Sequence, residues 1–172
     1  MGDDPTVALD GPKLQAMLQE IAAGKIQLPD FQREWKWDDE RIRALLATVT
    51  LEYPLGVVMT LETGGGKPPF KARTLAGAEG GAGHVPELLL LDGQQRLTSL
   101  FQALFLEQPV ETTDARGNKL RRWYYVNIAR AIEAGADRDE AIVSVPEDRL
   151  RICATPRVAY HTPSCSTVRH HR

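Results

Sequence analysis

The residues best suited to chemistry follow a run of four leucines at positions 88–91. The next five residues, 92–96, read Asp-Gly-Gln-Gln-Arg and lead into a helical pattern of apolar residues. A buried strand that turns tightly into a helix directs the first free amide groups of the helix at whatever lies above the strand end, which suits a phosphate or another oxyanion. Arg96 adds a charged fork, the glutamines add neutral donors and acceptors, and Asp92 is suited to hold a cation or polarise a water. The alternative is a plain turn, in which Gly93 supplies a special backbone angle, Asp92 caps the helix and the glutamines face solvent.

A second polar segment, residues 29–37, reads Pro-Asp-Phe-Gln-Arg-Glu-Trp-Lys-Trp. Aromatic side chains interleaved with basic ones can stack on a nucleobase while they contact phosphate. In the alternative, the aromatics belong to the core and the charges face solvent, and we favour this interpretation for Trp35 and Trp37.

The elements that must position these two segments follow from hydrophobic spacing and from glycine and proline breaks. Helices are predicted over residues 12–24, from the N-cap residues Asp38 and Asp39 to Tyr53, from Gly93 onward, and over 129–134. Strands are predicted over 55–61, 87–91 and 120–128, and residues 26–37 are expected to form a short strand or an ordered loop. The glycine-rich residues 63–86 are predicted to form a long loop with at most a short strand near 71–75.

The composition is that of one globular domain. The 172 residues are 42 % hydrophobic and 26 % charged, and the net charge of -2 gives no field over the whole molecule that would attract nucleic acid or lipid. Because no apolar run approaches the roughly 20 residues of a membrane span and the acidic start is unlike a signal peptide, we expect a cytoplasmic protein.

The last 22 residues differ from the rest of the chain. They hold both cysteines, three of the four histidines and no acidic residue. The spacing of these cysteines and histidines matches no familiar zinc pattern. Because there are only two cysteines, we expect neither a disulfide framework nor a thiol enzyme. The candidate ligands considered are Cys153, His161, Cys165, His170 and His171. Gly64-Gly-Gly-Lys67 likewise lacks the spacing of a P-loop and is expected to be a flexible loop.

Taken together, the two polar segments resemble the N-terminal domain of GmrSD-type restriction systems, a DGQQR-motif family with a fold similar to ParB and sulfiredoxin. The resemblance covers about residues 12–150. It rests on Gln27-Leu-Pro-Asp-Phe-Gln-Arg33 with Trp37, on the segment from Ile42 to Pro54, on Leu91-Asp-Gly-Gln-Gln-Arg-Leu-Thr98 and on Trp123-Tyr-Tyr-Val-Asn127. It implies an α+β fold of ParB/sulfiredoxin type, with one small mixed sheet and flanking helices.

The resemblance also implies a function, namely binding and hydrolysis of a nucleoside triphosphate, with Mg²⁺ as a candidate metal, in restriction of modified phage DNA. Because phosphoryl transfer depends on positioning and charge stabilisation, we expect the catalytic residues to be Asp92, which is also the candidate metal ligand, and Gln95, which would orient the attacking water. The implied nucleotide-binding residues are Gly93, Gln94, Arg96, Gln32 and Arg33. Modified DNA and a nuclease domain or subunit are the implied partners.

The chain also departs from that family. Nothing after Leu150 resembles the helical region or the nuclease domain that the family usually carries. We therefore expect a truncated domain over 12–150 and a disordered or aberrant tail over 151–172. Residues 1–11 are expected to form a flexible N-terminus. The alternatives to a nucleoside triphosphatase are a non-catalytic nucleic-acid sensor, in which Arg33, Lys36 and the aromatics read modified DNA, and an inactive remnant.

Overall fold

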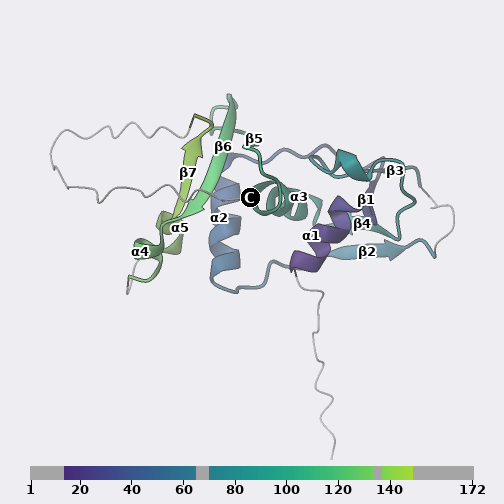
Figure 1. Cartoon of the computed structure of the whole chain (residues 1–172), viewed down its shortest axis with the longest axis horizontal. Helices are drawn as coiled ribbons and strands as arrows, with labels where there is room; N and C mark the ends of the chain where they lie inside the picture. Colours follow the sequence, from purple (N-terminus) through teal and green to yellow (C-terminus); the bar gives the residue numbers. More distant parts are fainter. Residues whose placement is uncertain (1–13, 65–69, 134–136, 149–172) are drawn as a thin grey trace, which may run out of the picture.

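The computed structural model describes residues 14–64, 70–133 and 137–148 and shows a mixed α+β protein (Figure 1). The predictions for residues 1–11, for the tail 151–172 with its cysteines and histidines, and for most of the Gly64–Lys67 loop lie outside these residues. Within the described part of the chain, no helix is long and apolar enough to cross a membrane.

The first sheet carries the predicted strand-turn-helix unit. Its strands are β1 (Ile26–Pro29), β2 (Met59–Glu62), β3 (Ala72–Arg73) and β4 (Leu88–Asp92), in the order β2-β4-β1-β3. β1 and β4 are parallel, and the two outer strands run antiparallel to their neighbours. Leu89 and Leu90 point to opposite faces of β4 and are both fully buried, which explains why this strand is an uninterrupted leucine run.

A second sheet was not expected and corrects the prediction of one small mixed sheet. It is antiparallel and consists of β5 (Val110–Thr113), β6 (Lys119–Val126) and β7 (Ile142–Pro146). Only β6 lies where a strand was predicted. β5 and β7 are four and five residues long, too short for their alternation to stand out, and they are stabilised by pairing with the longer β6.

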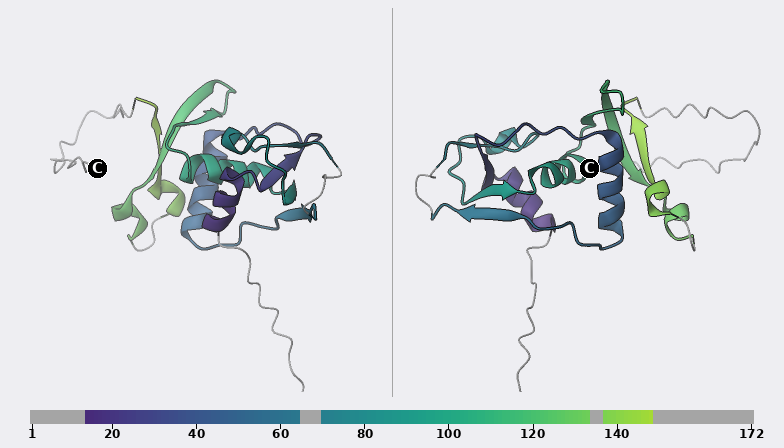
Figure 2. Two further views of the ribbon diagram at one scale, coloured as in Figure 1. Left: turned by 45° about the vertical axis from the view of Figure 1, so that its right-hand side comes forward. Right: turned by 180° about the vertical axis from the view of Figure 1, so that it is seen from behind.

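Three helices lie between the two sheets (Figures 1 and 2). They are α1 (Leu14–Ala22), α2 (Asp39–Thr50) and α3 (Gln94–Leu104), and all three were predicted. The Asp38 side chain accepts a hydrogen bond from the amide of Arg41, which confirms Asp38 as the N-cap of α2. Two single-turn helices, α4 (Ile128–Ala131) and α5 (Arg138–Ala141), and the 3-10 turn Glu79–Gly81 complete the described elements.

The core forms around α3, whose Leu97, Leu100 and Phe101 are buried against residues of α1, α2, β1 and β4. The strand predicted over 55–61 begins only at Met59. Residues 55–58 stay outside the sheet because the carbonyls of Leu55 and Val57 accept hydrogen bonds from a side chain of α3.

Gly24 follows the C-terminal end of α1, has a positive φ of 73° and lies against the backbone of Gly81. A Cβ at Gly24 would stand 2.5 Å from the Gly81 carbonyl oxygen, whereas Gly117 has a φ of 82° with nothing within 4 Å. Gly24→Ala therefore combines a clash with backbone strain, and Gly117→Ala carries the strain alone. We expect chemical denaturation to give a loss of about 1 kcal/mol for Gly117→Ala and at least about 2 kcal/mol for Gly24→Ala. Equal losses would contradict the close approach of the two glycine segments.

Candidate functional site

The turn between β4 and α3 has the backbone that the sequence predicts. Gly93 has a φ of 92° and is the N-cap of α3, with no side chain capping the helix start. A Cβ at this position would lie 3.2 Å from Cγ2 of Val58, so both the angle and the space favour glycine. One carboxylate oxygen of Asp92 accepts the Gly93 amide at 2.7 Å, and the Asp92 side chain is 71 % exposed. The first turn of α3 thus presents uncapped amides beside an exposed carboxylate.

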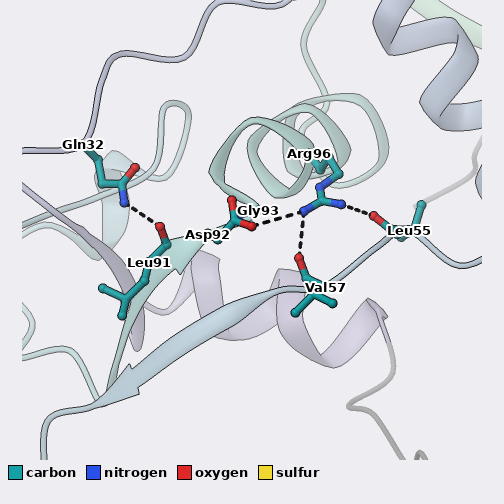
Figure 3. A network of polar contacts seen from close by, with 7 residues as sticks. All are labelled: Gln32, Leu55, Val57, Leu91, Asp92, Gly93 and Arg96. Atoms are coloured by element: carbon teal, nitrogen blue, oxygen red, sulfur yellow. Dashed lines mark hydrogen bonds and ion pairs between the residues drawn. The ribbon is translucent and has the colours of Figure 1, made fainter.

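Arg96 uses its guanidinium to hold the segment before β2 (Figure 3). Its Nη1 donates to the Leu55 carbonyl and its Nη2 donates to the Val57 carbonyl at 2.7 Å. Nη2 also lies 3.9 Å from Oδ2 of Asp92. The charged fork expected to bind phosphate is therefore occupied mainly by main-chain oxygens of this chain.

The three glutamines of the two motifs also bond to main-chain groups. Gln94 is only 4 % exposed and donates to the Arg33 carbonyl at 2.7 Å. Gln95 donates to the Glu34 carbonyl at 3.2 Å, and its Oε1 accepts the Lys36 amide at 3.0 Å. From the opposite side, Gln32 donates to the Leu91 carbonyl at 2.7 Å, as Figure 3 shows. The structure thus brings the two predicted segments together through these amides.

Of the predicted binding residues, Arg33 is the one whose side chain remains open. It is exposed and, among the described residues, has no hydrogen bond or ion pair through its guanidinium. Arg33 lines a cavity of about 290 Å³ together with Glu34, Lys36, Trp37, Arg41 and Gln95. Asp92, Gln94, Arg96 and Gln32 are not among its lining residues.

The cavity has an excess of positive charge. Three of its lining side chains are cationic and one, Glu34, is anionic, and Arg41 is also paired with Asp38 at 3.3 Å. Arg41 was missed by the sequence analysis because it enters from the first turn of α2, outside both motifs. Gln95 belongs both to the first turn of α3 and to the wall of the cavity, so it joins the predicted turn to the open cations.

Trp35 and Trp37 are packed against the core, as we predicted in preference to a role in base stacking. Nε1 of Trp35 donates to the hydroxyl of Ser99 on α3 at 3.0 Å. Trp37 lines the small cavity and also a larger groove of about 1070 Å³ that extends over the second sheet. Lys36, Lys119 and Arg121 are among the basic residues of that groove.

No cluster of three or more histidine, cysteine or acidic side chains suited to a metal occurs among the described residues. At the turn before α3, Asp92 is the carboxylate available for a cation. Mg²⁺ commonly uses one or two protein carboxylates together with phosphate oxygens, so a single Asp92 fits a metal that arrives with a substrate.

Fold and site define a small α+β domain in which the loop of residues 33–37, Arg41 of α2 and Gln95 of α3 form a cation-lined cavity. The chain belongs to the family of the GmrSD restriction endonuclease N-terminal domain, whose model matches residues 14–149. It is also similar to the uncharacterized protein MJ0686 of Methanocaldococcus jannaschii, with 28 % identity over 144 residues. That match covers 81 % of this chain and 24 % of the relative, so the chain spans about a quarter of the relative's length.

The position of Arg96 predicts a stability effect. Arg96→Ala leaves the carbonyls of Leu55 and Val57 without their charged donor, and we expect a loss of about 1.5 to 3 kcal/mol in the free energy of unfolding. Arg96→Lys restores the charge but cannot reach two carbonyls with one planar fork, so it rescues the loss only in part. The control is Arg33→Ala, an exposed change expected to stay within about 0.5 kcal/mol. Urea denaturation that ranks Arg33→Ala as the more damaging change would refute this role of Arg96.

Proposed function

We propose that this domain binds a nucleoside triphosphate at the cation-lined cavity and hydrolyses it, as the switch of a DNA restriction system directed at modified phage DNA. The observation that supports the phosphate site is the convergence of Arg33, Lys36 and Arg41 on one hollow with Gln95. A polyanion placed there would meet three positive side chains close to the positive end of α3.

In this proposal the motif residues have two kinds of role. Arg33 contacts the phosphates directly, with Lys36 and Arg41 beside it, and Trp37 offers a ring face for the base. The Gly93 turn sets the direction of the helix start. Gln32, Gln94 and Arg96 hold the loops that carry the contacting residues, so their contribution to binding is positional.

Hydrolysis requires a water aligned with the terminal phosphate, whose bond to the bridging oxygen breaks as the new bond to the water oxygen forms. We assign the orientation of this water to Gln95. Its Nε2 and Oε1 each make one bond to the backbone, which leaves one hydrogen and one lone pair free for a ligand or water. Asp92 lies at the same helix start but outside the lining of the cavity, and it would supply one carboxylate to a Mg²⁺ ion that arrives with the phosphates and would neutralise part of their charge. DNA cleavage is assigned to a separate nuclease domain or subunit.

A second function, nucleic-acid binding without catalysis, is supported by the groove of about 1070 Å³. Aromatic and basic side chains line it together, as in surfaces that stack bases and contact phosphates. This function differs from the first in its partner, modified DNA, and in its strong dependence on salt.

The phosphate site predicts a loss of affinity when its free cations are removed. Arg33→Ala and Lys36→Ala should each weaken nucleotide affinity by roughly tenfold or more, which corresponds to one charge-assisted contact of about 1.5 to 3 kcal/mol. Arg116→Ala, which removes an exposed arginine outside the cavity, should leave affinity unchanged. Calorimetric titration with purine and pyrimidine triphosphates in Mg²⁺ measures all three. If both cavity variants retain full affinity for every nucleotide but lose DNA affinity and flatten its salt dependence, the nucleic-acid function replaces the nucleotide function.

The role of Gln95 predicts a change in rate. Gln95→Ala should lower single-turnover hydrolysis at least about a hundredfold and change nucleotide affinity only a few-fold, because orientation of the water matters mainly in the transition state. Since Gln95 also bonds to the 34–36 backbone, the melting temperature of the variant is measured alongside. Rate and affinity falling by the same factor in a folded variant would make Gln95 a binding residue only.

A further inference from the structure

A second polar cavity, distinct from the nucleotide site, lies between α2 and the second sheet. Its volume is about 280 Å³, and three arginines line it with two acidic residues, one serine and one isoleucine. The lining residues are Asp39, Arg43, Arg122, Arg130, Glu140, Ile142 and Ser144. All of them belong to the described part of the chain, and none lines the Arg33 cavity.

Arg122 is the unusual member of this group. It occupies the middle of β6, opposite Val110 of β5 and Pro146 of β7. Its side chain is partly buried and its Nε is fully shielded from solvent, yet Nε has no hydrogen-bond partner. The described residues also provide its guanidinium with no ion pair within 4.0 Å. A buried guanidinium donor without an acceptor costs free energy, and an arginine side chain has five such donors.

The two carboxylates that line the cavity, Asp39 and Glu140, form no ion pair with Arg122 within 4.0 Å. Arg130 is paired with Glu140 at 3.3 Å. Asp39 directs one oxygen at two hydroxyls, accepting from Tyr124 at 2.9 Å and from Ser144 at 2.5 Å. Burial, together with the Asp39 carboxylate, raises the pKa of Tyr124, so its phenol stays a neutral donor at neutral pH. Arg43 donates to the neutral carbonyls of Asp139 and Ile142.

Two arginines, Arg43 and Arg122, therefore face one cavity without carboxylates of their own. From this arrangement we infer a binding site for the oxyanion of a phosphate group, held by the planar fork of Arg122 and by the charge of Arg43. Arginine forks match the oxygen spacing of phosphate, and a phosphate in the cavity would face a guanidinium that forms no ion pair with the described residues. The phosphate is either that of a free phosphorylated molecule or a phosphodiester of nucleic acid. The second source is close at hand because Arg122 also lines the groove of about 1070 Å³.

The test uses the full chain carrying Arg33→Ala and Lys36→Ala, so that the proposed nucleotide cavity is silenced and the two proposals can fail separately. Inorganic phosphate and pyrophosphate are titrated by calorimetry, and the Nε–H signals of the arginines are followed by NMR. We expect the Nε–H signal of Arg122 to shift on titration and Arg122→Gln and Arg43→Gln each to weaken phosphate affinity at least about tenfold. The control is Arg116→Gln, which removes the same charge from an exposed arginine that lines neither this cavity nor the larger groove; it should leave affinity unchanged.

A stability measurement separates an anion site from a structural arginine. In phosphate-free buffer Arg122→Met should keep or raise the melting temperature, because it removes an uncompensated charge while retaining the length of the side chain. A short DNA duplex identifies the source of the phosphate. If the duplex competes with phosphate, and Arg122→Gln lowers the number of ions released on DNA binding by about one, the ligand is a phosphodiester. If the duplex does not compete, the ligand is a free phosphate. Phosphate affinity that is unchanged in both the Arg122 and Arg43 variants, or a marked fall in the melting temperature of Arg122→Met, overturns the proposal.

Discussion

The hydrogen bonds that side chains of the first turn of α3 donate end on main-chain oxygens of two separate loops. Arg96 holds the carbonyls of Leu55 and Val57, and Gln94 holds the carbonyl of Arg33. At these positions neither loop belongs to a helix or strand. Its carbonyls therefore need hydrogen-bond donors from side chains where they approach the core. A charged fork and a buried amide provide these donors at a fixed angle. The cavity of Arg33 exists in its present shape because this turn fixes the loop on which Arg33 lies.

Much of the arrangement could be predicted because its causes are local. The leucine run, the Asp-Gly break and the apolar spacing after it specify β4, the turn and α3, and Asp38 specifies the start of α2. The partners of Arg96 could not be predicted, since Leu55 and Val57 lie about 40 residues away and backbone carbonyls carry no residue signature. For the same reason the strand near residue 55 was placed too early. The second sheet escaped prediction because β5 and β7 depend on pairing with β6 rather than on their own composition.

The site shows the same division between local and long-range causes. Arg33 and Gln95 were identified from their motifs, and the structure brings them to one cavity. Arg41 reaches the cavity because α2 packs against the loop of residues 33–38, and no spacing in the sequence indicates this contact. The sequence made Gln94 as suitable for a ligand as Gln95. In the structure Gln94 is only 4 % exposed, whereas Gln95 lines the cavity. Adjacent positions on a helix point about 100° apart, so two identical neighbouring side chains cannot share one environment.

The loop of residues 33–38 links the two ends of the molecule. On one side Gln94 and Gln95 bind its backbone to α3, and on the other the hydroxyl of Thr112 donates to the Trp37 carbonyl at 2.6 Å. Asp38 forms a β-bridge with Thr113. A displacement of this loop toward a ligand in the cavity of Arg33 would stretch bonds to β5, while a ligand in the larger groove would press on the same Lys36 and Trp37. The cavity of Arg33 and the larger groove therefore share lining residues on one loop, which hydrogen bonds hold to α3 on one side and to β5 on the other.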